Sequence, residues 1–177
     1  VGPDYVGPEL ELDNGHKRDL WGVEWKYTKF SDGAGYWNEV DHPLKDVQTI
    51  EELENYNWPQ LDWYDFSKLE EQCDKYKDYA IMTAPGIASP GIFQSPVQPL
   101  LGVVRSLMEA YMNPEFLKKL IDKILDFQLP FIEKMLKSAN GKIDFFRLGD
   151  DFGTQSGLLM DIGMWEEFIQ PAFKKMN

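Results

Sequence analysis

Two short apolar runs, "YAIMTA" at residues 79–84 and "IDFFRL" at residues 143–148, restrict the folds open to this chain more than any other feature. Short, nearly continuous apolar runs are typical of strands that are buried on both faces of a sheet. The segment between them has helical periodicity, and a strand–helix–strand crossover makes the two strands parallel. We therefore predict an α/β fold, either an open doubly wound sheet or a (β/α)8 TIM barrel. Neither run is followed by a G-x-G-x-x-G or Walker loop, which favours the barrel.

Helices are expected between and after the two runs. Ser95 is a candidate N-cap before Pro96, and Asn113 with Pro114 repeats this start signal for a longer helix. A further helix is expected at residues 162–176. The longer helix carries a stripe of helical period that should face the core, formed by Leu117, Leu120, Ile121, Ile124, Gln128, Phe131 and Met135.

The first 65 residues have a different character, with many Trp, Tyr, Asp, Gly and Pro. The aromatic runs "DLWGVEWKY" and "GYWNEV" flank "TKFSDGAG", which predicts a β-hairpin. Thr49 and Glu52 have the spacing of a capping box, which predicts a short helix. We expect one domain with a hairpin-bearing excursion at residues 1–65 and strand–helix units at residues 66–177. The sequence begins within a loop-like pattern and ends within a helical pattern, so we expect this domain to be incomplete at both ends.

Composition narrows the range of partners. The formal net charge of −12 argues against nucleic acid and anionic membranes, and no apolar run could span a bilayer. The single cysteine cannot form an internal disulfide and these residues contain no signal-like segment, so we expect a cytoplasmic location. A small-molecule substrate fits these limits. The open strand edges of an incomplete barrel also favour a homodimer.

Metal ligands are scarce in the chain. Cys73 lies on an apolar helical stripe, and His16 and His42 lie in the hairpin-bearing region. Zinc needs three or four ligands in one place. We therefore expect structural roles for these three residues and no metal site within this chain.

The loop "RLGDDFGTQSG" at residues 147–157 carries adjacent carboxylates at the predicted end of a strand. Asp150 and Asp151 are followed by Thr154 and Gln155. One interpretation is a plain strand-to-helix turn, in which Asp and Gly are common. The other is a ligand-facing loop, because α/β proteins place their sites at the carboxyl ends of strands. Neighbouring side chains diverge in an extended backbone, so one carboxylate can face a ligand while the other braces the loop.

Three segments together resemble the uroporphyrinogen decarboxylase family, over about residues 21–176. They are "TIEELENYNWP…DFS", "NPEFLKKLIDKILDF" and "IDFFRLGDDFGTQSGLLM…MWEEFIQPAFKKM". The family also contains methyltransferases that move methyl groups to or from corrinoid proteins and thiols. The stretch "GDDFGTQSG", with the preceding "YWNEVDHPL", is similar to that branch. The resemblance implies a partial (β/α)8 barrel, of which this chain is a middle piece.

The resemblance also implies roles for particular residues. Asp151 aligns with a substrate-facing serine of the decarboxylases, which makes it the expected catalytic carboxylate, with Asp150 beside it and braced against Arg147. Arg147, Thr154 and Gln155 are then expected to contact substrate. The loop "APGIASPGIFQS" should line the same mouth through Phe93, Gln94 and Ser95, near the position of the family's substrate-contacting tyrosine.

Three hypotheses about function follow from these patterns. The first is a methyltransferase-like member of the family, with a corrinoid protein or a thiol as methyl acceptor or donor. The second is uroporphyrinogen decarboxylase itself, a lyase of porphyrin biosynthesis. The third is a non-catalytic acidic binding domain. The family's zinc ligands, a His-x-Cys and a later Cys, are absent from this chain. Zinc and a corrinoid protein are therefore expected only for the full-length enzyme, and the piece alone is expected to be inactive.

Overall fold

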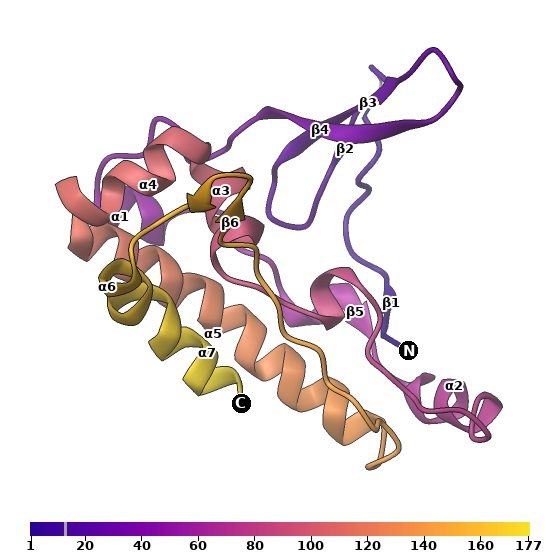
Figure 1. Cartoon of the computed structure of the whole chain (residues 1–177). Coiled ribbons are helices and arrows are strands. Elements are labelled where there is room, and N and C mark those ends of the chain that lie inside the picture. Colours follow the sequence, from indigo (N-terminus) through magenta and orange to yellow (C-terminus); the bar gives the residue numbers. More distant parts are fainter. Residues whose placement is uncertain (13) are drawn as a thin grey trace.

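One long helix organises the molecule. The computed structural model describes residues 1–12 and 14–177, and its fold is α/β with several helices and small sheets. Helix α5 (Pro114–Ser138) crosses the molecule diagonally in Figure 1, and α7 (Gln170–Met176) runs alongside it. All seven residues of the predicted stripe are buried on α5, which confirms the predicted face. Asn113 and Pro114 stand at its start, as predicted.

The other helices are short. They are α1 (Ile50–Glu54), α2 (Leu69–Lys75), α3 (Gln98–Leu101), α4 (Val103–Met112) and α6 (Ile162–Met164). Tight 3₁₀ turns cover Leu61–Trp63 and Gly86–Ala88, and wider π-helical turns cover Phe93–Val97 and Trp165–Ile169. The last of these turns joins α6 to α7, so residues 162–176 form the predicted C-terminal helical segment.

The two predicted helix starts at Thr49 and Ser95 have different outcomes. The Thr49 side chain accepts a hydrogen bond from the Glu52 amide, and the Glu52 side chain accepts one from the Thr49 amide. This is the predicted capping box. Ser95 has the extended backbone of an N-cap (φ −150°, ψ 112°), but none of the described hydrogen bonds joins its side chain to a following amide, and α3 begins only at Gln98.

The predicted β-hairpin is present. Strands β3 (Glu24–Lys29) and β4 (Gly35–Asp41) pair antiparallel, and the short β2 (Lys17–Arg18) extends the sheet in the order β2-β3-β4. Gly33 takes a positive φ of 90° in the turn, where a side chain would be strained. Figure 1 shows the hairpin projecting from the molecule, away from α5. Two smaller antiparallel pairs join β1 (Asp4–Tyr5) to β5 (Tyr64–Asp65) and β6 (Gly153–Thr154) to β7 (Gly157–Leu158).

The two apolar runs lie side by side and parallel, but they are not regular strands. Their contact is one parallel bridge between Met82 and Phe145, supported by the Thr83 amide, which donates to the Phe145 carbonyl at 3.1 Å. The prediction that both runs are buried is wrong: Tyr79 is 75% exposed, Met82 48% and Phe145 60%. Apolar runs become buried only when other strands flank them, and the described residues supply no such neighbours. No closed barrel forms in the part of the chain that the structure describes.

The hairpin-bearing region shares its core with α5. Trp21 packs edge-on against Phe127 of α5, with ring centroids 5.6 Å apart, and Tyr64 packs edge-on against Phe131 at 5.0 Å. These four residues belong to one buried cluster. The packing of Trp21 on α5 therefore holds the neighbouring part of the chain, which includes Asp19, against the long helix. None of the described helices combines the length and the apolar composition needed to cross a membrane.

Candidate functional site

Asp150 joins the loops that follow the two apolar runs. Its Oδ2 accepts hydrogen bonds from the backbone amides of Ile92 (2.8 Å) and Phe93 (2.5 Å), and its Oδ1 accepts one from Gln94 (2.6 Å). The two loops are about 57 residues apart in sequence. One carboxylate thus fastens both loops side by side.

The electrostatic state of Asp150 reflects its partial burial. Removal from water raises the pKa of its carboxyl, while the three amide donors oppose that rise. The expected brace against Arg147 does not form: the Asp150 carboxylate is held by backbone amides. The Arg147 amide donates instead to Oγ1 of Thr83 at 3.2 Å, and its side chain is exposed.

A cavity of 360 Å³ opens beside this junction, and we call it the Asp150 cavity. Its volume is near the lower end of the range for small-molecule sites, about 300–1,000 Å³. Its walls come from four parts of the chain: residues 19–21, the loop at residues 86–95, Gly149 with Asp150, and Gln128 of α5. The cavity therefore combines both loops that were predicted to contain the site.

Gln128 is the most unusual residue in the lining. It is only 2% exposed, and its Nε2 donates to the Gly91 carbonyl at 3.1 Å. Its Oε1 is buried and has no hydrogen-bond partner among the described residues. Buried side-chain oxygens nearly always have a partner, so this atom is an exception among the described residues.

Asp19 provides a second carboxylate in the lining. It accepts hydrogen bonds from the amides of Trp21 (2.9 Å) and Val23 (3.0 Å), and from Nε1 of Trp25 (2.8 Å). Burial raises the pKa of this carboxyl, and the hydrogen bond from Trp25 opposes the rise. The described lining contains no lysine or arginine, so acidic and neutral groups alone define its polarity.

The predicted site residues divide into two groups. Gln94, Ser95 and Asp150 line the cavity. The residues outside its lining are Phe93, Arg147, Asp151, Thr154 and Gln155.

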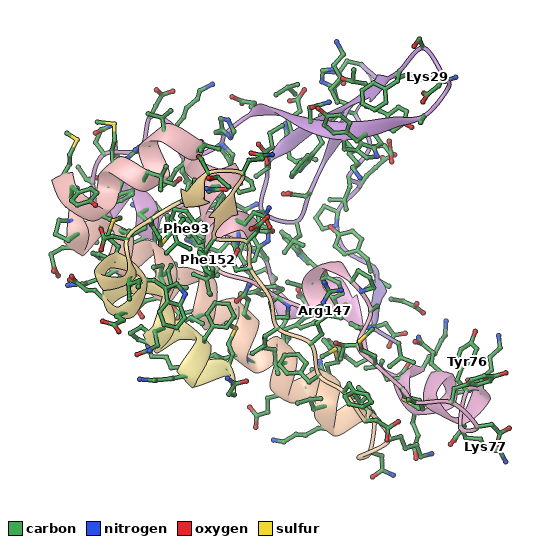
Figure 2. All side chains as sticks on the ribbon, viewed as in Figure 1. Lys29, Tyr76, Lys77, Phe93, Arg147 and Phe152 are labelled. Carbon is green, nitrogen blue, oxygen red and sulfur yellow. The ribbon has the colours of Figure 1, made fainter. Side chains whose placement is uncertain are left out.

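The residues of the second group have other surroundings. Phe93 is buried and stacks near Phe152, with ring centroids 6.5 Å apart, and Figure 2 shows Arg147 away from this pair. Asp151 is exposed and accepts a hydrogen bond from the Gly153 amide at 3.0 Å. Oγ1 of Thr154 is used inside the β6–β7 turn, where it donates to the Gly157 carbonyl at 2.9 Å. The loop therefore directs Asp150, and not Asp151, to the cavity.

Gln128 and Asp19 are among the lining residues that were not identified as site residues from the sequence. Gln128 did give a signal, because it is the one polar member of an otherwise apolar stripe. Asp19 gave no such signal, because it lies in the aromatic region, far in sequence from the predicted loops. Only the packing of Trp21 on α5 brings Asp19 to the cavity.

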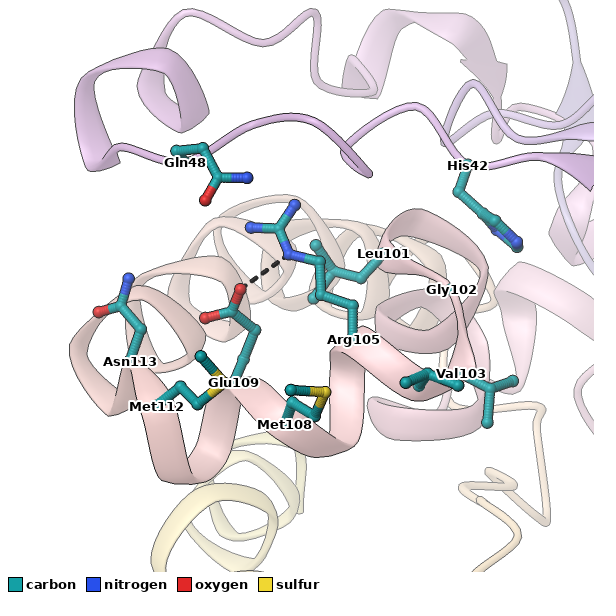
Figure 3. A pocket seen from close by; sticks show the side chains of 11 residues that line it. His42, Gln48, Leu101, Gly102, Val103, Arg105, Met108, Glu109, Met112 and Asn113 are labelled. Atoms are coloured by element: carbon teal, nitrogen blue, oxygen red, sulfur yellow. Dashed lines mark hydrogen bonds and ion pairs between the residues drawn. The ribbon is translucent and has the colours of Figure 1, made fainter.

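A larger groove of 850 Å³ lies between α4 and the segment before α1 (Figure 3). Its central charged residue is Arg105, whose Nε donates to Glu109 at 2.7 Å. The other guanidinium nitrogens donate to the carbonyls of Leu44, Lys45 and Val47. Because Arg105 is already occupied in fastening this segment to α4, the groove offers less polar chemistry than the Asp150 cavity.

Metal binding finds no support in the residues present. No group of three or more His, Cys, Asp or Glu side chains among residues 1–12 and 14–177 could hold an ion. His16 pairs with Glu24 at 2.6 Å, and Nδ1 of His42 lies 2.8 Å from the Pro99 carbonyl. Cys73 is fully buried in α2, where burial raises the pKa of its thiol. These residues do not fit a zinc site.

Comparison of the chain with models of protein families, with curated proteins and with solved structures gives no match.

Proposed function

We propose that this chain is part of a methyltransferase-like enzyme of the uroporphyrinogen decarboxylase family, and that the Asp150 cavity receives part of its small-molecule substrate. One observation carries the proposal: the loops after two adjacent parallel segments meet at Asp150, and a cavity opens where they meet. Loops after parallel strands are where α/β enzymes place their chemistry. The sequence resemblance supplies the reaction class.

The charge of the cavity favours methyl transfer over decarboxylation of a porphyrinogen. Uroporphyrinogen carries several carboxylates and would need cationic side chains to hold them. The charged groups of the described lining are Asp19 and Asp150, and the whole chain carries a formal charge of −12. Like charges would repel such a substrate. A neutral or cationic substrate fits this lining better.

The residues of the cavity can hold a substrate and limit the access of water to it. Gln94 and Ser95 lie at the exposed rim, and the buried Gln128 forms part of the lining. Apolar atoms of Leu20 and Trp21 form part of the wall. Fixing the carbon skeleton of a substrate against such walls would align its reacting group and reduce the entropy lost in the reaction. When bound, a corrinoid protein would supply or receive the methyl group.

A product assay tests the reaction class. The full-length protein that contains this chain is incubated with methylcobalamin and 2-mercaptoethanol, because the piece alone is expected to be inactive, and the methyl thioether is measured by mass spectrometry. In the reaction the thiolate sulfur forms the new bond to carbon with its own electron pair, and the carbon–cobalt bond breaks with its pair left on cobalt. We expect thioether in excess of the reaction without protein.

Matched variants connect that activity with the cavity. Gln94→Ala alters the rim, whereas Gln155→Ala alters an exposed position outside the lining. We expect only the first change to reduce the rate, by about tenfold or more if the substrate is misplaced. Decarboxylation of uroporphyrinogen by the same protein would favour the decarboxylase instead. Neither product from the folded full-length protein would favour an acidic binding domain.

A further inference from the structure

Helix α4 turns its polar side inward and its apolar side to solvent. Its buried residues are Ser106 and Glu109. Val104, Met108 and Met112 are spaced four positions apart and form a ridge along the helix, with exposed fractions of 72%, 47% and 72%. A surface helix normally does the opposite and buries its apolar side. The apolar side of α4 therefore needs a partner that the described residues do not supply.

Contacts on the inner side of α4 fix this orientation. Arg105 donates to the carbonyls of Leu44 at 2.6 Å and Lys45 at 2.8 Å, and its Nε donates to Glu109 at 2.7 Å (Figure 3). The segment before α1 thus presents backbone carbonyls to α4, and buried carbonyls require donors. Turning the helix over would break these hydrogen bonds and place apolar side chains against the carbonyls. The exposure of the ridge is therefore imposed by the packing of α4.

Further exposed side chains extend the ridge into one apolar surface. The Tyr111 hydroxyl donates to Oδ2 of Asp161 at 2.9 Å, which holds the start of α6 beside α4. We call this surface the α4 face; its members are each between 46% and 72% exposed, and they are Val103, Val104, Met108, Tyr111, Met112, Leu158 and Ile162. Together they offer on the order of 800 Å² to a partner, which is about what each side of a stable interface contributes.

Charge favours one kind of partner for the α4 face. None of its seven side chains is charged, and the nearby carboxylate of Asp161 is already bound to Tyr111. The neighbouring Glu115 and Glu167 both pair with Lys118. A basic partner would therefore gain little attraction here. The formal charge of −12 repels a second copy at a distance, but physiological salt screens this repulsion beyond about 8 Å. A neutral face permits contact between two acidic chains.

The shape of the α4 face is complementary to itself. The groove of 850 Å³ lies along one side of the ridge, and a hollow of 600 Å³ lies on the Tyr111 side. In a two-fold arrangement the ridge of each copy can lie in the groove of the other, which is the common packing of two helices through i±4 ridges. Met108 is the middle residue of the ridge, so its two copies would meet at the axis. Methionine side chains adapt readily to such a contact.

We propose that the α4 face is a dimer interface and that its occupant is the α4 face of a second copy of this protein. The inner contacts of α4 impose its exposure, its area suffices for a stable dimer, and its neutrality and shape suit an identical surface. The homodimer expected from the sequence then forms through α4, and not through the open edges of residues 79–84 and 143–148. The proposal is independent of the proposed reaction, because the α4 face shares no residue with the Asp150 cavity.

Sedimentation equilibrium of the 177-residue chain measures the association. We expect a dimer with a dissociation constant of about 10 µM or tighter. Met108→Glu and Met108→Lys each place two like charges at the axis, and each should weaken the dimer by about a hundredfold or more. Tyr79→Glu is the matched control, because it puts the same charge on another exposed apolar residue, at the open edge. It should leave the dissociation constant unchanged.

A mixture of the two Met108 variants tests the two-fold arrangement. Opposite charges then meet at the axis, so equal amounts should form a heterodimer although neither variant pairs with itself. Far-UV circular dichroism checks that each variant is folded. If either is not, Val104→Glu repeats the test at a second exposed position of the ridge.

Several results would overturn the proposal. A monomeric chain would show that the α4 face has another occupant. Loss of the dimer in Tyr79→Glu, with the Met108 variants unaffected, would assign the contact to the open edges. Failure of the mixed variants to pair would contradict the two-fold axis at Met108. A dimer of the 177-residue chain that is absent from the full-length protein would assign the α4 face to another segment of the same protein.

Discussion

Replacing Asp150 by asparagine should loosen the junction of the two loops. The carboxylate presents two acceptor oxygens to three backbone amides, those of Ile92, Phe93 and Gln94. Asparagine keeps one oxygen and puts an NH₂ group in the place of the other. In the better of its two orientations, the oxygen retains the Ile92 and Phe93 amides. The NH₂ group then faces the Gln94 amide, donor against donor.

The magnitude follows from these contacts. An unsatisfied donor costs about 1–3 kcal/mol, and a hydrogen bond to a charged group contributes about 1.5–3 kcal/mol. Two effects reduce the loss: the exposed Gln94 can turn to water, and removing a partly buried charge relieves the desolvation that raises the pKa of Asp150. We expect a loss of about 2 kcal/mol, or about 4–8 °C in Tm for a chain of this length.

Thermal and urea unfolding followed by circular dichroism measure this loss. Asp151→Asn is the matched control, because its exposed carboxylate has a single local contact, with the Gly153 amide. The control should change stability by less than about 0.5 kcal/mol. Equal melting temperatures for Asp150→Asn and the unaltered chain, or an equal loss in the Asp151 control, would refute the bracing role.

Three further predictions use the same measurements. First, burial raises the pKa of Asp150, so its protonation stabilises the folded state. The advantage of the unaltered chain over Asp150→Asn should be largest below the unfolded pKa of about 3.9, and shrink as pH rises through the folded pKa; a constant difference from pH 3 upward would contradict this. Second, Gly91→Ala places a Cβ 2.4 Å from the Gly149 carbonyl and should cost about 1–3 kcal/mol; an unchanged urea midpoint would contradict the close approach. Third, Thr49→Ala removes the cap that bonds the Glu52 amide and should cost about 1 kcal/mol, and an unchanged Tm would contradict it.

Local patterns were the most reliable guide to this fold. The stripe on α5 could be read from the sequence because helical period alone decides which residues share a face. The capping box at Thr49 and the hairpin around Gly33 depend on residues only a few positions apart. Such features need no knowledge of the remaining chain.

Burial of the apolar runs could not be predicted in the same way. A run such as "YAIMTA" has the composition of a central strand, but its burial depends on which segments lie on each side. Here Tyr79 and Phe145 face solvent. Ser95 shows the same limitation: it has the sequence and the extended backbone of a helix cap, but none of the described hydrogen bonds joins its side chain to a following amide.

The cavity was predictable in part. The rule that loops after parallel strands carry the site points to both loops, and Gln94, Ser95 and Asp150 line one cavity. Which of two adjacent carboxylates faces it depends on backbone register, which the sequence did not define. Asp19 reaches the cavity only through the packing of Trp21 on α5, which no local pattern encodes.

The contact between Asp150 and residues 92–94 also has a consequence for folding order. It closes a loop that contains all of α4 and α5, so it can form only after that crossover is compact. The cavity is therefore absent from any partly folded state in which α5 has not docked. Its backbone amides at residues 92–94 should exchange with solvent as one group with the core of α5. Ligand binding in the cavity would stabilise the crossover as a whole. This stabilisation would extend to the end of the crossover farthest from the cavity, without any rearrangement of the site.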